Sequence, residues 1–278
     1  MKKISRRSFM AAAAVSVAAL ALTACGGSAS SAASSVASSA ASSEAVSSAA
    51  AAELTTVEAG KLTMATNATF PPYEMTTDSG EIEGIDVDTA KAIAEKLGLE
   101  LQIDDMDFDA ALLSVQQGKA DIVMAGVTVT DERKAVMDFS DSYATGIQSI
   151  IVPNDSDIAS PDDLAGKKIG TQRGTTGYIY CSDDFGEDSV VAYDSGLTAV
   201  QALNNGQVDA VVIDNAPATE YVAANPGLKV LDTSYAEEDY AIGMAKGSAL
   251  EDAVNKALEE LKADGTLQAI ADKYINAN

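Results

Sequence analysis

The chain has 278 residues, enough for one large domain or two smaller ones, and 47% of them are hydrophobic, as in an ordinary folded protein. Its 42 acidic residues far outnumber the 18 basic ones, so nucleic acid is not an expected partner. The absence of histidine excludes Ser-His-Asp and Cys-His catalysis and the usual zinc sites, and no cofactor is expected.

Residues 1–24 have the pattern of an export signal. Four basic residues, Lys2, Lys3, Arg6 and Arg7, precede an apolar run. The run ends in Leu-Thr-Ala-Cys-Gly, which resembles the bacterial lipobox, where the signal is cut before a cysteine that receives lipid. We therefore expect lipid on Cys25 and an anchored protein on the extracytoplasmic face of the cell membrane. Residues 5–10 also resemble the twin-arginine motif, which leaves the export route open.

Residues 25–53 are almost wholly serine and alanine and have no periodic apolar face. This composition predicts a flexible linker that holds the folded part on the order of 30 Å from the membrane. We expect the fold to begin near Leu54. Cys181 is the only cysteine after Cys25, so an intramolecular disulfide is not expected, and a small semi-buried apolar role is favoured for it over a nucleophile.

The first folded elements alternate between strand and helix. Residues 61–66 read as a short strand, and Pro71 and Pro72 prevent its continuation. An amphipathic helix is expected to start at residues 86–88 and to end at Gly98. A second strand is expected at residues 101–103.

A second helix is predicted for residues 107–117, with Gly118 as its stop. Residues 121–125 form an apolar run without alternation, which is typical of a strand covered on both faces. Strands that alternate with helices in this way favour a parallel α/β sheet.

The stretch from Met124 to Tyr143 contains the first candidate site. Thr128 and Arg133 lie just beyond a predicted strand end, next to hydroxyls and free backbone amides. Such an arginine suits a carboxylate, because its guanidinium fork matches a carboxylate with two hydrogen bonds. The alternative is a surface arginine that pairs with neighbouring acidic side chains in a first helical turn.

A new unit is expected after the apolar run 147–153. Residues 160–163, Ser-Pro-Asp-Asp, have the cap, the proline and the acids of a helix start, and residues 168–171 read as a strand. The Gly-Thr-Thr-Gly turn at 174–177 follows at once, and a turn into a helix offers free N–H groups to an anion. Near the end of the chain, residues 240–244 read as a strand and residues 249–261 and 267–275 as helices.

The two halves of the chain echo each other. Four residues of the first half recur at a constant offset in the second, as Leu112, Val115, Gly118 and Asp121 and then Val200, Leu203, Gly206 and Asp209. If the echo holds, Gly126 at the end of one strand corresponds to Asp214 at the end of another. Ligands of open α/β sheets bind beyond the carboxyl ends of strands, so both residues are candidates for one site. A common helix-glycine-strand unit would produce the same match by coincidence.

Several motifs, in this order, resemble the polar amino acid-binding proteins of ABC importers. They are residues 66–74 (TNATFPPYE), 84–88 (GIDVD), 108–109 with 118–121, 126–140, 174–177 and 212–214. The resemblance implies an α/β, two-lobed type II periplasmic binding protein fold, in which each lobe is a mainly parallel sheet flanked by helices. It implies two hinge crossings, placed near residues 147–152 and 238–242. Residues 54–149 and 240–278 would form lobe 1 and residues 150–239 lobe 2.

The resemblance also implies roles for nine residues. Arg133, Thr175 and Thr176 would hold the α-carboxylate of an amino acid, Gly126, Thr128 and Asp214 its α-ammonium group, and Asn67, Phe70 and Phe108 its side chain. Each has a simpler alternative. Thr175 could only cap a helix, Asp214 could be a turn residue, and the two phenylalanines could be ordinary core.

The implied function is capture of a free L-amino acid by cleft closure and its delivery to an ABC permease, as a monomer without metal or cofactor. Since Asn67 is neutral, a neutral polar ligand such as glutamine is expected. An alternative is an enzyme on the same fold, similar to cyclohexadienyl dehydratases, for which Glu74 is the candidate general acid. Another alternative is a ligand-sensing module that presents its closed form to a receptor.

Overall fold

The computed structural model describes residues 54–275. The predicted signal segment, Cys25 and the linker lie outside these residues. Within them, no helix is both long and apolar enough to cross a membrane. All the described elements belong to one compact unit.

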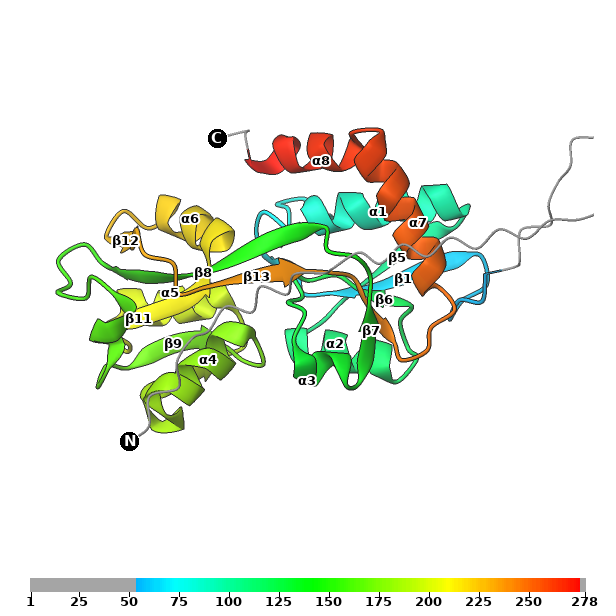
Figure 1. Ribbon diagram of the computed structural model, residues 1–278. Coiled ribbons are helices and arrows are strands. Elements are labelled where there is room, and N and C mark those ends of the chain that lie inside the picture. The colour runs from blue at the N-terminus through cyan, green and yellow to red at the C-terminus, as the bar shows by residue number, and fades with distance from the viewer. Residues whose placement is uncertain (1–53, 276–278) are drawn as a thin grey trace, which may run out of the picture. The chain divides into compact units, whose positions relative to one another are not determined.

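The first sheet has the strand order β5-β1-β6-β14-β7. Figure 1 labels β5, β1, β6 and β7 of this sheet. The strands of the sheet are β1 (Lys61–Thr66), β5 (Glu100–Asp105), β6 (Ile122–Val123), β7 (Met137–Phe139) and β14 (Gly243–Ala245). β1 runs parallel to β5 and β6, whereas β14 runs antiparallel to β6 and β7. The predicted strand at 61–66 is confirmed. The strand predicted at 121–125 is shorter, because the chain turns away at Gly126, where φ is 55°.

Helices cover both faces of this sheet. They are α1 (Ile85–Leu97), α2 (Phe108–Gln116), α3 (Asp131–Lys134), α7 (Glu251–Ala263) and α8 (Thr266–Ile275). On one face α1 and α7 bury Ile93 and Leu258 against β1, and on the other α2 buries Ala111 and Val115. The helices expected around residues 86–98, 107–117, 249–261 and 267–275 are confirmed within two residues at each end. We call this sheet and its helices the first lobe.

A small antiparallel sheet extends the first lobe after β1. It consists of β2 (Thr69–Phe70), β3 (Glu74–Thr76) and β4 (Ile82–Glu83). Pro71 and Pro72 are joined by a cis peptide bond between β2 and β3. The hairpin between β2 and β3 brings Glu74 back beside the carboxyl end of β1, which places it near the candidate site.

The second sheet has the order β10-β9-β11-β8-β12, and β13 also pairs with β8. Its strands are β8 (Ala144–Pro153), β9 (Ile169–Gln172), β10 (Val190–Tyr193), β11 (Ala210–Asp214), β12 (Leu228–Val230) and β13 (Ala236–Tyr240). β9 runs parallel to β10 and β11, and the strands that pair with β8 run antiparallel to it. Both sheets are therefore mixed. Parallel strands form the core of each, and the antiparallel pairs are made by β14 in the first sheet and by β8 in the second.

Three helices flank the second sheet, and together with it they form the second lobe. They are α4 (Thr176–Phe185), α5 (Gly196–Asn204) and α6 (Asn215–Ala223). Cys181 of α4 is fully buried against β9 and β11, and burial raises the pKa of its thiol to about 12, in keeping with an apolar role. The helix expected from residues 160–163 is only a 3-10 turn, Pro161–Leu164, because the backbone at Ala165 is already extended.

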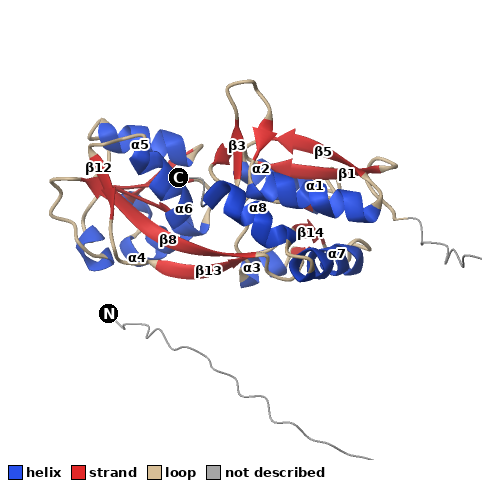
Figure 2. Cartoon of the chain, turned by 90° about the horizontal axis from the view of Figure 1, so that it is seen from above, coloured by secondary structure: helices blue, strands red, loops and turns tan. Residues whose placement is uncertain are grey.

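Two neighbouring strands carry the chain between the sheets. The chain leaves the first sheet after Phe139, enters the second at Ala144, and returns after Tyr240. β8 and β13 run side by side (Figure 2). In their pairing, Ala144 lies opposite Tyr240. The single strand predicted at 240–244 is therefore wrong, since β13 ends and β14 begins within it. The limits and the hinging of the two lobes stay predictions.

The internal echo is real in three dimensions. α2 and α5 have the same length and the same offset as the sequence match, and the glycines after them, Gly118 and Gly206, have φ of 65° and 69°. Asp121 accepts a hydrogen bond of 2.7 Å from the N–H of Thr63, and Asp209 one of 2.8 Å from the N–H of Lys168. Each aspartate thus ties the start of one parallel strand to its neighbour.

Candidate ligand-binding site

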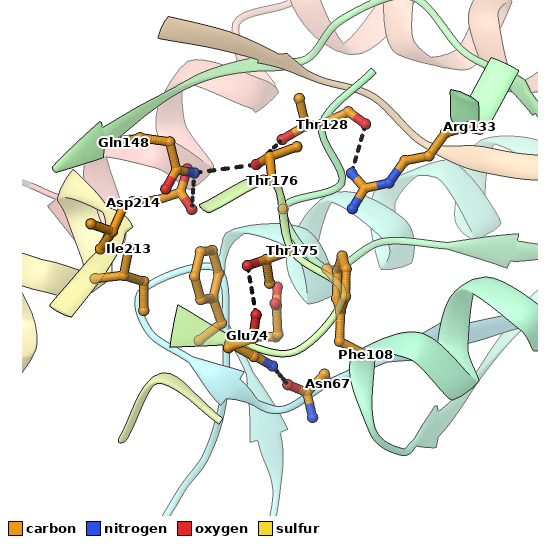
Figure 3. A pocket seen from close by; sticks show the side chains of 15 residues that line it. Asn67, Glu74, Phe108, Thr128, Arg133, Gln148, Thr175, Thr176, Ile213 and Asp214 are labelled. Carbon is orange, nitrogen blue, oxygen red and sulfur yellow. Dashed lines mark hydrogen bonds between the residues drawn. The ribbon is translucent and has the colours of Figure 1, made fainter. Parts of the chain in front are cut away.

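A pocket lies where the carboxyl ends of β1, β6, β9 and β11 meet (Figure 3). Its lining comes from both lobes and includes all nine predicted residues: Asn67, Phe70, Phe108, Gly126, Thr128, Arg133, Thr175, Thr176 and Asp214. The cavity between them measures about 20 Å³, the space of roughly one water molecule. The structure brings the predicted residues together, while their contacts with a ligand stay a prediction.

Arg133 reaches into this pocket from the short helix α3. The hydroxyl of Thr130 caps that helix by accepting the N–H of Arg133 at 3.2 Å. The guanidinium donates to the carbonyl oxygens of Thr128 at 2.8 Å and Gly174 at 3.2 Å, and it lies 5.4 Å from the ring centre of Phe108. The residue is only 9% exposed, so it is not a surface arginine. Burial lowers the pKa of its guanidinium, and nearby Glu238 opposes that change.

The two threonines of the predicted carboxylate site differ in what their hydroxyls do. The hydroxyl of Thr175 caps α4, accepting the N–H of Tyr178 at 3.3 Å and donating to the carbonyl of Gln172 at 2.8 Å. The hydroxyl of Thr176 donates to Glu238 at 3.0 Å. Both side chains therefore have protein partners, and an anion at this end of α4 would meet backbone N–H groups.

The predicted ammonium side is built from Gly126 and Asp214. A side chain at Gly126 would place its Cβ 2.8 Å from the ring of Phe70, and the N–H of Gly126 donates to Asp86 at 2.9 Å. Asp214 ends β11 and is 8% exposed, so it is not merely a turn residue. Its carboxylate accepts from Gln148 at 2.9 Å and from the hydroxyl of Tyr240.

Burial raises the pKa of Asp214 to about 6. The hydrogen bond from Tyr240 counteracts this increase, the negative charge of Glu238 adds to it, and the bond from Gln148 lowers the pKa again. A cation beside Asp214 would therefore replace lost hydration and stabilise the ionised form.

The predicted side-chain pocket contains amide and aromatic groups. Asn67 donates to the carbonyl of Met106 at 2.9 Å and accepts from Gln172 at 2.8 Å, which joins the two lobes. Phe70 and Phe108 are both 7% exposed and belong to hydrophobic clusters, yet both line the pocket. These two rings therefore pack in the core and also line the pocket.

Sequence reasoning missed Gln148, Gln172 and Glu238. Gln148 lies in the buried apolar strand β8, where an amide side chain is itself a signal. Gln172 ends β9 just before the glycine turn, so its place at a strand end could have been noticed. Glu238 belongs to an acidic run of three residues that reads as a surface feature, although Glu238 is only 7% exposed.

Glu74 also lines the pocket, and it is buried without a donor. Its side chain is 0% exposed, and within residues 54–275 no N–H or O–H of another residue donates to either carboxyl oxygen. Burial, and next the nearby Asp86, raise the pKa of Glu74 well above its usual value, while burial raises that of Asp86 to about 6. A neutral Glu74 that donates its proton to the Asp86 carboxylate satisfies both groups.

Comparisons with known proteins agree with this geometry. Residues 62–277 match the profile of the bacterial extracellular solute-binding proteins, family 3. The L-cystine-binding protein TcyJ of Escherichia coli K12 is 33% identical over 80% of this chain and 85% of its own. The ABC transporter arginine-binding protein 1 of the same strain is 34% identical, over 78% and 91%.

A solved structure of an ancestral arginine-binding protein bound to glutamine is also similar. It has a TM-score of 0.73 and 43% identity, and the match covers 77% of this chain and 97% of that one. The expected two-lobed fold is confirmed by this likeness, and so is the expectation of a binding protein in place of an enzyme, since these relatives are named as binding proteins.

Proposed function

The chain belongs to family 3 of the bacterial extracellular solute-binding proteins, and we propose that it captures a free L-amino acid with a neutral polar side chain and presents it to an ABC permease. The observation that carries this proposal is the pair Arg133 and Asp214. They are opposite charges, both buried, and they line one pocket from different lobes.

Each of these buried charges is costly unless it meets an opposite charge. A zwitterionic amino acid supplies both opposite charges at once. Its carboxylate would bind the guanidinium of Arg133 and the N–H groups that open α4. Its ammonium group would bind Asp214, the carbonyl of Gly126 and the hydroxyl oxygen of Thr128.

Closure of the two lobes would couple this binding to transport. Because the ligand contacts come from both lobes, they are complete only in a closed form, and ligand binding therefore shifts the population towards that form. Because the pocket is lined from both lobes, a ligand would enter while the lobes are apart. The closed form is then what a permease would recognise.

The neutral amides of Asn67 and Gln172 favour a neutral polar side chain such as that of glutamine. The ancestral relative is named as an arginine-binding protein and yet was solved with glutamine, so arginine is the natural competitor to test. We further propose that lipid on Cys25 anchors the protein outside the cell membrane, and that the protein acts as a monomer.

A thermal-shift screen tests the proposal. The chain from residue 25 onward, with Cys25→Ala to prevent lipidation, would be heated with each of the common amino acids. A ligand at about a thousand times its dissociation constant adds about 4 kcal/mol to the free energy of unfolding, which gives a clear shift. A screen in which no amino acid raises the melting temperature would refute the proposed function.

A further inference from the structure

Glu238 lies directly behind the pocket wall, where the two lobes and a crossing strand meet. It belongs to β13, opposite Gly146 of β8, and is 7% exposed. Its Oε2 accepts from the hydroxyls of Thr128 at 3.3 Å and Thr176 at 3.0 Å, and from Nε2 of Gln148 at 2.9 Å. Its Oε1 accepts from the hydroxyl of Tyr180 at 2.7 Å. Glu238 therefore receives hydrogen bonds from three residues that line the pocket.

These bonds decide what the two threonines can offer a ligand. A threonine hydroxyl has one hydrogen to donate and two lone pairs to accept with. A carboxylate only accepts, so Thr176 donates its single hydrogen to Glu238. Thr128 donates its own either to Glu238 at 3.3 Å or to the hydroxyl oxygen of Thr176 at 3.4 Å. Their oxygens can then only accept from a group in the pocket.

Gln148 extends this arrangement to Asp214. Its Nε2 donates to Asp214 and to Glu238, each at 2.9 Å, so both amide hydrogens point at carboxylates. Asp214 lies opposite Gln148 in the pairing of β11 with β8, which explains the contact. Figure 3 shows Gln148 between Asp214 and Thr176. The amide is thus oriented by two acids and links them.

We propose that Glu238 is a positioning residue that turns the wall formed by Thr128, Thr176 and Asp214 into a surface of acceptors only, which selects a charged α-ammonium group over an uncharged substituent. This inference rests on the proposed function and deepens it. It moves the hydroxyl of Thr176 from the carboxylate side to the ammonium side. The ligand carboxylate is then left to Arg133 and to the N–H groups of α4.

The same contacts make the surface depend on closure. Thr128 belongs to the first lobe, Thr176 and Tyr180 to the second, and Glu238 to the strand that crosses between them. Backbone hydrogen bonds tie the segment around Thr128 to the end of β13, because the N–H of Val129 donates to the carbonyl of Asp239 at 3.0 Å. Separation of the lobes would therefore part Thr128 from Thr176, and with it the two hydroxyls of this surface. Recognition of the ammonium group is therefore complete only in the closed form.

The test compares ligands that differ only at the α-nitrogen. The probes are L-glutamine and L-arginine, together with the 2-hydroxy acid counterpart of each, and the readout is the dissociation constant by titration calorimetry. A 2-hydroxyl has one donor and two lone pairs, which would face acceptors in the wild-type pocket. In Glu238→Gln the new amide donates, so a threonine hydrogen becomes free to point into the pocket.

We expect Glu238→Gln to reduce the preference for the amino acid over its hydroxy acid by at least about tenfold, the scale of one hydrogen bond to a charged group. Glu237→Gln is the matched control, because Glu237 is its exposed neighbour on the same strand, and its preference should equal that of the wild type. An equal loss of affinity for both probes in Glu238→Gln would mean a merely structural role and would overturn the inference.

A second variant keeps the test decisive if Glu238→Gln does not fold. Thr176→Val removes the hydroxyl and keeps the shape, so it should weaken the amino acid about tenfold and affect the hydroxy acid much less. Equal losses would show that Thr176 serves the carboxylate, against the inference. If the wild-type protein binds no amino acid at all, the proposed function fails with it, whereas failure in the variants alone refutes only the role of Glu238.

Discussion

Replacing Arg133 with alanine is expected to weaken amino acid binding by at least about 2 to 5 kcal/mol, the cost of truncating one member of a buried charge pair. This corresponds to a dissociation constant roughly thirtyfold to several thousandfold higher. The magnitude follows from the surroundings of the guanidinium, which is 9% exposed and held by two carbonyl oxygens. A ligand carboxylate would enter the same desolvated space without a counter-charge.

Arg133→Lys separates charge from geometry. Lysine keeps the positive charge but has no planar fork, so it cannot replace two parallel hydrogen bonds to a carboxylate. We expect its loss to lie between those of the wild type and Arg133→Ala. The matched control is Arg173→Ala, because Arg173 is exposed and lies 3.7 Å from Asp194. Its removal should change the dissociation constant by less than about twofold, as for surface ion pairs.

The assay is titration calorimetry with the amino acid that the thermal screen identifies, at constant pH and salt. Circular dichroism would confirm that each variant keeps its secondary structure. A folded Arg133→Ala protein that binds within about threefold of the wild type would refute the assignment of the carboxylate to Arg133, since one buried charge-assisted bond alone is worth more.

Three further results are expected. Because the ligand ammonium group prefers the ionised form of Asp214, whose pKa is raised to about 6, affinity should fall as the pH drops below about 6, and calorimetry between pH 4.5 and 8 would show a flat profile if Asp214 is not involved. Because the pKa of buried Glu74 is raised, its protonated form contributes stability at low pH, and this stability is lost as the pH rises. Glu74→Gln cannot ionise, so it should raise the melting temperature more at pH 8 than at pH 4.5. Glu81→Gln, at an exposed position, is the control. Equal shifts in the melting temperature of Glu74→Gln at both pH values would contradict the raised pKa of Glu74. Thr175→Ala should cost about 1 kcal/mol of unfolding free energy through the lost α4 cap, and unchanged denaturant midpoints would argue against it.

Much of the fold could be predicted from the sequence because its signals are local. Apolar periodicity and glycine stops located the helices, and the echo around Asp121 and Asp209 correctly paired the two halves. The pairing of β14 and β13 with other strands could not be predicted, since a strand's partner depends on the path of distant segments. For the same reason residues 240–244 read as one strand, although the chain changes sheets there.

Part of the candidate site could likewise be predicted from the sequence, and part could not. Arg133 follows the end of a strand and Asp214 is the last residue of β11, so their position at the pocket could be predicted from the sequence. Gln148 and Glu238 act through the register of β8 against β11 and β13, which sets Gln148 opposite Asp214 and Glu238 opposite Gly146. No local pattern encodes such a register. From the sequence, packing in the core and lining the pocket were alternatives for Phe70. In the structure its ring packs in a hydrophobic cluster and also lines the pocket.

The distribution of acids around the pocket argues for a neutral ligand side chain. Asp214 and Glu238 lie where we propose that the ligand ammonium group binds, and several hydrogen-bond donors satisfy them. Burial and the nearby Asp86 raise the pKa of Glu74, which favours its neutral form. The amides of Asn67 and Gln172 also line the pocket, and Glu74 and Asp214 are the acidic residues among its described lining. A cationic side chain beside these amides would be buried without a counter-charge, whereas an amide would exchange hydrogen bonds with two amides. Tighter binding of arginine than of glutamine would show that this distribution does not decide the ligand.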